Sequence, residues 1–286
     1  MMLESILLTD RSAFILSAFI YLIAFLYGSL TLGWNKHYSH KAVFFLITSG
    51  FIIQTIGLNL RAISVGGCPL GNFFEIAQFI SWSTVLLYYI VGPVYRIHLL
   101  SLFCAGLATI LTGVSLLMPS LDKSYPISEY DPSVWIELHA SLAVFSYAFF
   151  ALVTLLSVMF LIQQHGLKKK QDGSIYNTLA PIQKLDQLSH RLMLTGVICL
   201  TAALACGAIF YIKSGQSVPF FKLIVSCLVW IGYCGVIVLR NQGKLVTRRH
   251  AIAVIALFIF ALLSLWPVQS ARLQPNDTAE EPLKNE

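Results

Sequence analysis

Hydrophobic residues in this chain are gathered into eight long runs that short polar segments separate. Each run is long enough to cross the hydrocarbon core of a bilayer, which needs about 20 apolar residues in a helix. Because a membrane-buried backbone must satisfy its own hydrogen bonds, helices are the natural form for such runs. The pattern therefore predicts an all-α fold with about eight transmembrane helices, at Arg11–Leu32, Ala42–Arg61, Phe73–Val94, His98–Met118, Val134–Gln163, Leu192–Ile212, Phe220–Leu239 and Ala251–Val268.

Composition supports a membrane protein. Hydrophobic residues make up 57% of the chain and charged residues 11%, and the mean hydropathy is +0.76. Soluble domains carry about 25% charged residues. We therefore expect a polytopic membrane helical bundle embedded in a lipid bilayer.

The positive charges predict which way the bundle is oriented. Most of the 19 Lys and Arg residues follow the first, third, fifth and seventh runs, and cytoplasmic loops are enriched in these residues. Both termini are thus expected outside the cell membrane. The first run follows Glu4 and Asp10 rather than a basic segment, which favours a retained span over a signal peptide.

The chain divides into one membrane domain and a tail. We predict a single transmembrane domain over residues 1–270, since no connection between the runs is long enough to fold alone. Residues 271–286 are polar and charged, with Pro275 and Pro282, and predict a disordered tail.

One carboxylate stands out. Glu75 lies in the first turns of the third run, directly after the turn-rich segment Gly66–Pro69. Carboxylates near hydrocarbon are costly and are candidates for function. Arg61 closes the preceding run at the same face, so we expect the two to pair and to hold the Pro69 loop over the bundle. The pair would either be structural or shape a pocket for a propionate or another anion.

His139 is the second candidate. It lies at the outer start of the fifth run, one turn inside the interface that Trp135 marks. Such an imidazole can ligate a haem iron through one nitrogen while the other makes a hydrogen bond, or it can simply bond a neighbouring helix. The other histidines, among them His37, His40 and His98, are interpreted as ordinary polar residues at the cytoplasmic face.

No enzymatic motif is present. The sequence has no Gly-rich phosphate loop, no Gly-x-Ser-x-Gly elbow and no carboxylate pair spaced for acid–base chemistry, so no enzyme is predicted. Five of the six cysteines lie in predicted spans, and Cys68 has no Cys-x-x-Cys partner, which argues against disulfide exchange.

Several motifs resemble one family. They are Pro69-Leu70-Gly71-Asn72 before Glu75, Ser146-Tyr147-Ala148 after His139, the runs Gly196–Thr201 and Gly207–Phe210, and the spacing of Trp230, Tyr233 and Arg240. In that order they resemble the polytopic cytochrome c assembly proteins of the CcsA and HemX-like kind. The resemblance implies an eight-helix frame, a place in c-type cytochrome biogenesis or haem handling, and His139 as an axial haem ligand. Arg61 and Glu75 would contribute to the cofactor site.

The chain departs from the family pattern at its haem-facing loop. Typical members carry a Trp-rich loop ending in Trp-Asp-Pro-Lys-Glu, whereas Lys213–Lys222 contains neither Trp nor Asp. Counting from Trp230, Val238 stands where the family has a His before its Arg, and the eighth run ends in Trp266-Pro267-Val268-Gln269 without a second outward His. The resemblance thus implies a degenerate, HemX-like accessory or regulator in the inner membrane. Its expected partner is a ResB-like assembly subunit or a haem-synthesis enzyme. A membrane transporter and a structural scaffold without haem are the alternatives.

Overall fold

The computed structural model describes residues 9–34, 38–118, 122, 134–170, 174–214, 220–245 and 247–265. All secondary structure in these ranges is helical. The helices are α1 (Asp10–Gly33), α2 (His40–Val65), α3 (Phe73–Tyr95), α4 (Leu100–Leu117), α5 (Val134–Lys169), α6 (Ser174–Thr178), α7 (Ile182–Ser214), α8 (Phe220–Asn241) and α9 (Thr247–Leu263).

Side-chain caps fix where three of the helices begin. The side chains of Thr9, Ser39 and Asn72 accept hydrogen bonds from backbone N–H groups in the first turns of α1, α2 and α3. These N–H groups have no partner inside the helix, so a short polar side chain at this position is favourable. Helix α2 ends at Gly66, whose φ of 71° is left-handed and is readily adopted by glycine.

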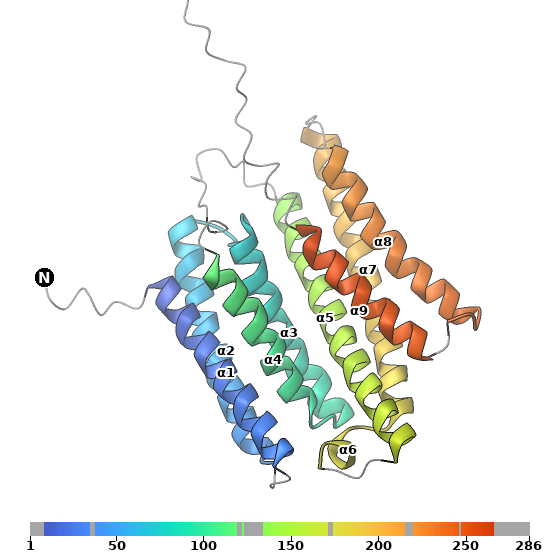
Figure 1. Ribbon diagram of the computed structural model, residues 1–286. Coiled ribbons are helices and arrows are strands. Elements are labelled where there is room, and N and C mark those ends of the chain that lie inside the picture. Colours follow the sequence, from blue (N-terminus) through green and yellow to red (C-terminus); the bar gives the residue numbers. More distant parts are fainter. Residues whose placement is uncertain are drawn as a thin grey trace, which may run out of the picture.

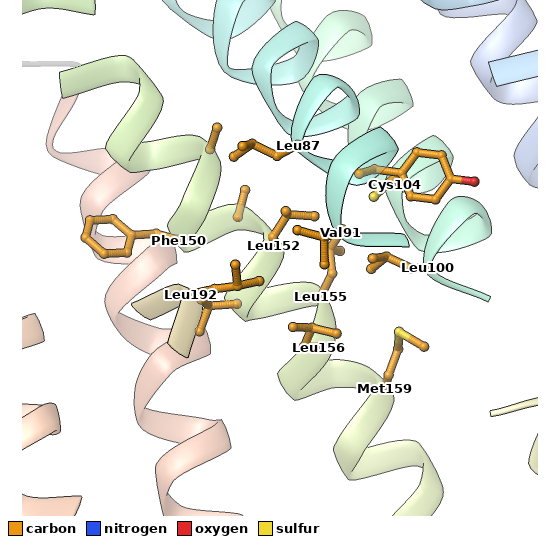
Figure 2. Close-up of a cluster of buried hydrophobic side chains, with 14 of the residues drawn as sticks. Leu87, Val91, Leu100, Cys104, Phe150, Leu152, Leu155, Leu156, Met159 and Leu192 are labelled. Atoms are coloured by element: carbon orange, nitrogen blue, oxygen red, sulfur yellow. The ribbon is translucent and has the colours of Figure 1, made fainter. Parts of the chain in front are cut away.

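Helix α5 joins two groups of helices. Figure 1 shows α1–α4 on one side of α5 and α7–α9 on the other. The contact of α5 with α7 is the most extensive between any two described helices, and α5 also packs on α3 and α9. Figure 2 shows the hydrophobic cluster at this junction, where Leu152 and Leu155 of α5 lie near Val91 of α3 and Leu192 of α7. The chain thus folds as one bundle around α5.

A buried chain of polar side chains crosses the first four helices. The Tyr21 hydroxyl of α1 donates to Gln54 of α2 (2.9 Å), and Gln54 donates to the side chain of Gln78 in α3 (3.0 Å). Gln78 in turn donates to the hydroxyl of Ser115 in α4 (2.9 Å). All four side chains are fully buried. Because unpaired polar groups inside a bundle are costly, this network fixes the relative heights of α1–α4.

The membrane-spanning prediction is confirmed. By length and composition, seven of the described helices can cross a membrane: α1–α5, α7 and α8. The eighth predicted span, Ala251–Val268, corresponds to α9, which has 17 described residues; residues 266–268 lie outside the described part. The protein is a polytopic membrane helical bundle. The predicted tail, 271–286, also lies outside the described residues.

The structure differs from the prediction most between α5 and α7. Helix α7 begins at Ile182, ten residues before the predicted Leu192, and the short helix α6 occupies part of the predicted cytoplasmic loop. Polar residues in Ile182–Arg191 make this segment look like a loop in the sequence. In the structure its apolar residues Leu185 and Leu188 are buried in the core, while Asp186 pairs with Arg240 of α8 (2.7 Å).

The two ends of the bundle differ in charge. One, here called the basic end, carries Arg96, Lys168, Lys169, Arg240 and Lys244 at helix ends or in turns. The other, here called the Arg61 end, carries Arg61, the loop Gly66–Asn72 and the start of α5. Helix α1 begins and α9 ends at the Arg61 end (Figure 1), as expected of a chain whose two termini share one side.

Candidate functional site

Arg61 lies at the centre of an ion-pair network. It is only 7% exposed, in the last turns of α2. Its Nε donates to Glu75 Oε1 (2.8 Å), its Nη1 to Asp10 Oδ2 (3.1 Å) and its Nη2 to Asp122 Oδ1. One guanidinium therefore connects the start of α1, the end of α2, the start of α3 and the α4–α5 connection.

Glu75 is the most buried carboxylate of this network. Glu75 is only 2% exposed. The Asn72 side chain accepts from the Glu75 backbone N–H at the start of α3, and the neighbouring Phe74 packs against Phe14 (5.5 Å between ring centroids). The second carboxylate oxygen of Glu75, Oε2, accepts a hydrogen bond from the backbone N–H of Gly71 (2.7 Å). The Glu75 carboxylate of α3 thereby binds the Pro69 loop through Oε2 and Arg61 of α2 through Oε1.

The predicted pairing of Arg61 with Glu75 is confirmed, and three further residues join it. Asp10 and Asp122 lie far from Arg61 in the sequence, and Arg11 pairs with Asp122 as well (3.2 Å). No spacing in the sequence relates these residues to one another. The only available signal was the acidic residue next to the predicted start of the first run.

Cys68 brings the loop against α5. Cys68 is exposed in this loop, near Ser141 of α5 and near the carboxylates of Glu137 and Glu75. Desolvation raises the pKa of the Cys68 thiol above its ordinary value; the Ser141 hydroxyl opposes this shift and the two carboxylates add to it. A raised pKa lowers the fraction of thiolate, the form that attacks disulfides. The direction of this shift does not favour disulfide exchange at Cys68.

His139 faces a different neighbour. Its Nδ1 lies 2.7 Å from the carbonyl oxygen of Ala203 in α7, the distance of a short hydrogen bond. The ring packs on Gly207, one turn further along α7, so closely that a Cβ there would lie 2.8 Å from Nδ1. Glycine at this position is what lets the imidazole enter the seam between α5 and α7. The sequence showed Gly207 only as part of a motif, not as a contact of His139.

An aromatic ring and a cation adjoin this seam. Trp135 lies one helical turn before His139 on α5, and the Lys213 ammonium of α7 sits 4.9 Å from the centroid of its indole. Such a cation–π contact contributes about 0.5–1 kcal/mol at exposed sites. The Arg61 end of the α5–α7 seam therefore presents an imidazole, an indole and an ammonium group. Arg61 and Glu75 meet one another, while His139 turns toward α7.

The donor set limits which cofactors the described residues can hold. Among these residues there is no group of three or more His, Cys, Asp or Glu side chains that could bind a metal ion. A site at His139 would therefore have at most two such ligands from these residues, a number that a haem site can use.

Comparison with known proteins places the chain in a family. A family described as Cytochrome C assembly protein matches residues 70–273, more than half of the chain. Protein HemX of Bacillus subtilis (strain 168) is 26% identical over 250 residues, which cover 85% of this chain and 88% of that protein. Protein HemX of Brevibacillus brevis is 28% identical over 60% of this chain and 62% of its own length. Cytochrome c biogenesis protein CcsA of Prochlorococcus marinus (strain NATL1A) is 28% identical over 68% of this chain and 70% of its own. The chain belongs to the cytochrome c assembly protein family.

Proposed function

We propose that this protein handles haem at the Arg61 end of the bundle, as an accessory or regulatory member of c-type cytochrome biogenesis, and that His139 would hold the iron. The contact between His139 Nδ1 and the carbonyl oxygen of Ala203 carries this proposal. A carbonyl oxygen only accepts hydrogen bonds, so Nδ1 must carry the proton. In the neutral imidazole the lone pair then resides on Nε2, the form that ligates iron, and the carbonyl makes it more basic.

The surroundings of His139 suit a flat, partly anionic ligand. Trp135 provides an apolar ring face and Lys213 a cation at the same end of the seam. When bound, haem would supply an iron centre and two carboxylates. His139 would hold the iron, Gly207 would leave room for the imidazole, and Lys213 would be placed to pair with a carboxylate.

Arg61 and Glu75 contribute to the proposed cofactor site by positioning. All three kinds of guanidinium nitrogen of Arg61 donate to carboxylates, and Glu75 binds the Gly71 N–H. These contacts hold the loop that carries Cys68 beside α5. We propose that the network keeps the Gly66–Asn72 loop in one position beside α5. The loop would then border the haem site without blocking the approach of the haem carboxylates to Lys213.

The proposed role is that of an accessory rather than a ligase acting alone. The segment 213–222 lacks the Trp-rich sequence of typical haem-presenting members, and the relative that this chain covers most completely among those described above is a protein named HemX. We therefore propose that the chain itself catalyses no covalent step. Its partner would be a ResB-like assembly subunit or an enzyme of haem synthesis, and it would lie in the inner membrane with the basic end in the cytoplasm.

The experiment that tests this function is a haem titration of the detergent-purified protein. The wild type is expected to bind about one haem with a Soret shift, and His139→Ala to lose it. His165→Ala is the matched control, because His165 is an exposed histidine in the last turns of the same helix, at the basic end. If no haem binds to the wild type, or if His139→Ala binds it equally well, the proposal fails in favour of a transporter or scaffold.

A further inference from the structure

Two histidines that are far apart in the sequence meet at the basic end. His40 is the first residue of α2, and His98 lies in the turn between α3 and α4. Their ring centroids are 4.7 Å apart, with an angle of 40° between the ring planes. Helix α5, which carries His139 near its start, begins at the opposite end of the bundle from the start of α2 (Figure 1), so this pair is separate from the proposed haem site.

Neighbouring side chains pack on the His40 ring and bond the backbone of His98. Tyr38 packs edge-on against His40, with 4.5 Å between ring centroids, and is itself only 5% exposed. The Ser101 hydroxyl donates to the backbone carbonyl of His98 (3.0 Å) and lies 3.3 Å from the Tyr38 hydroxyl. Because the Ser101 proton is engaged by His98, the Tyr38 hydroxyl donates to Ser101. The segment before α2 and the turn before α4 are thus joined around the two imidazoles.

The spacing of the rings distinguishes between ligand classes. A metal–nitrogen bond of about 2.0–2.1 Å places an imidazole centroid about 3.2 Å from the ion. Two imidazoles on opposite sides of a haem iron would then have centroids about 6.4 Å apart. Adjacent positions of an octahedral or tetrahedral ion give about 4.5–5.2 Å, and the observed 4.7 Å falls in that interval. The centroid distance is compatible with neighbouring ligands of one ion and is too short for a haem sandwich.

We propose that His40 and His98 form a binding site for a first-row divalent cation, of which Zn²⁺ is the probe of choice, with water in the remaining positions. Imidazole nitrogen suits Zn²⁺, Ni²⁺ and Cu²⁺, whereas Mg²⁺ and Ca²⁺ prefer oxygen ligands. His98 is exposed, so the ion reaches the site from the aqueous side. Bound metal would clamp the start of α2 to the α3–α4 turn.

The test is Zn²⁺ binding to the full chain, purified in detergent through a tag without histidine. Isothermal titration is expected to give one Zn²⁺ per wild-type chain and an affinity at least tenfold lower for His98→Gln. His165→Gln, another exposed histidine of the basic end, is expected to bind as the wild type does. His98 is the variant of choice because it lies in an exposed turn, whereas His40 starts a helix.

A second measurement reports the ligands directly. X-ray absorption of the Zn²⁺-loaded protein is expected to show two imidazoles in the wild type and one or none in His98→Gln. The proposal is overturned if the wild type binds no Zn²⁺, if His98→Gln binds it as tightly, or if the bound ion shows no imidazole loss in that variant. Haem titration of the same His98→Gln protein is expected to be unchanged, so the outcome is independent of the haem proposal.

Discussion

Replacing Arg61 by Met should destabilise the protein more than any other single change in the ion-pair network. The substitution keeps an apolar stem but leaves Glu75, whose side chain is 2% exposed, without its cation. Removing one partner of a buried ion pair costs about 3–5 kcal/mol, because the remaining charge stays buried. Asp10→Asn should cost only about 0.2–1 kcal/mol, since that side chain is 22% exposed and its pair with Arg61 resembles a surface ion pair.

Glu75→Gln lies between these extremes. The amide can still accept from the Gly71 N–H, and Arg61 keeps Asp10 and Asp122, so the loss is that of one charged hydrogen bond, about 1.5–3 kcal/mol. The double variant Arg61→Met with Glu75→Gln removes the uncompensated charge. It should therefore be more stable than the sum of the two single losses predicts.

Unfolding in a mild detergent, followed by Trp fluorescence and by labelling of the buried Cys104, would measure these differences. The expected order of stability is wild type, Asp10→Asn, Glu75→Gln, Arg61→Met. If Arg61→Met were no less stable than Asp10→Asn, or if the double variant showed strictly additive losses, the buried network would not hold the Arg61 end together as described.

Three further predictions concern other parts of the bundle. Gly207→Ala should weaken haem binding about tenfold, because its Cβ would lie 2.8 Å from His139 Nδ1 and overpacking costs about 1–3 kcal/mol; Gly113→Ala, with nothing within 4 Å, should leave the haem titration unchanged. A membrane-impermeant maleimide should label Cys68 from outside whole cells, and labelling only after lysis would contradict the orientation. Because the pKa of Cys68 is raised, its labelling rate should keep rising at pH values where the rate of a free thiol, with a pKa of about 8.5, no longer changes. Gln54→Leu should lower stability by about 1–3 kcal/mol for each buried partner left unpaired, and an unchanged unfolding curve would show that the polar network is not needed.

Hydrophobic periodicity predicted the helices well because membrane burial imposes long apolar runs. It failed where a helix leaves the apolar region. Asp186 and the polar residues around it made the start of α7 look like a loop, yet Leu185 and Leu188 are buried and Asp186 pairs with Arg240. Helical continuation there depends on tertiary partners from α8, which the local pattern does not contain.

In the candidate site, too, some contacts were predictable from the sequence and others depend on how the helices pack. The pairing of Arg61 with Glu75 was predictable because both flank one short loop, so their separation in space is bounded by the chain. Asp122 reaches the same guanidinium from the α4–α5 connection, and His139 meets Gly207 across two helices. Such contacts depend on the relative rotation of packed helices, which composition and spacing leave undetermined.

Rescue of a His139→Gly variant by free imidazole tests the central claim most directly. The variant removes the ring but keeps the Ala203 carbonyl and the space beside Gly207 that received it. The account predicts that His139→Gly loses the wild-type Soret band and that added imidazole restores it, while 2-methylimidazole, which carries a methyl group beside the ring nitrogens, restores it less. A wild-type spectrum in His139→Gly without imidazole would contradict His139 as the ligand of haem.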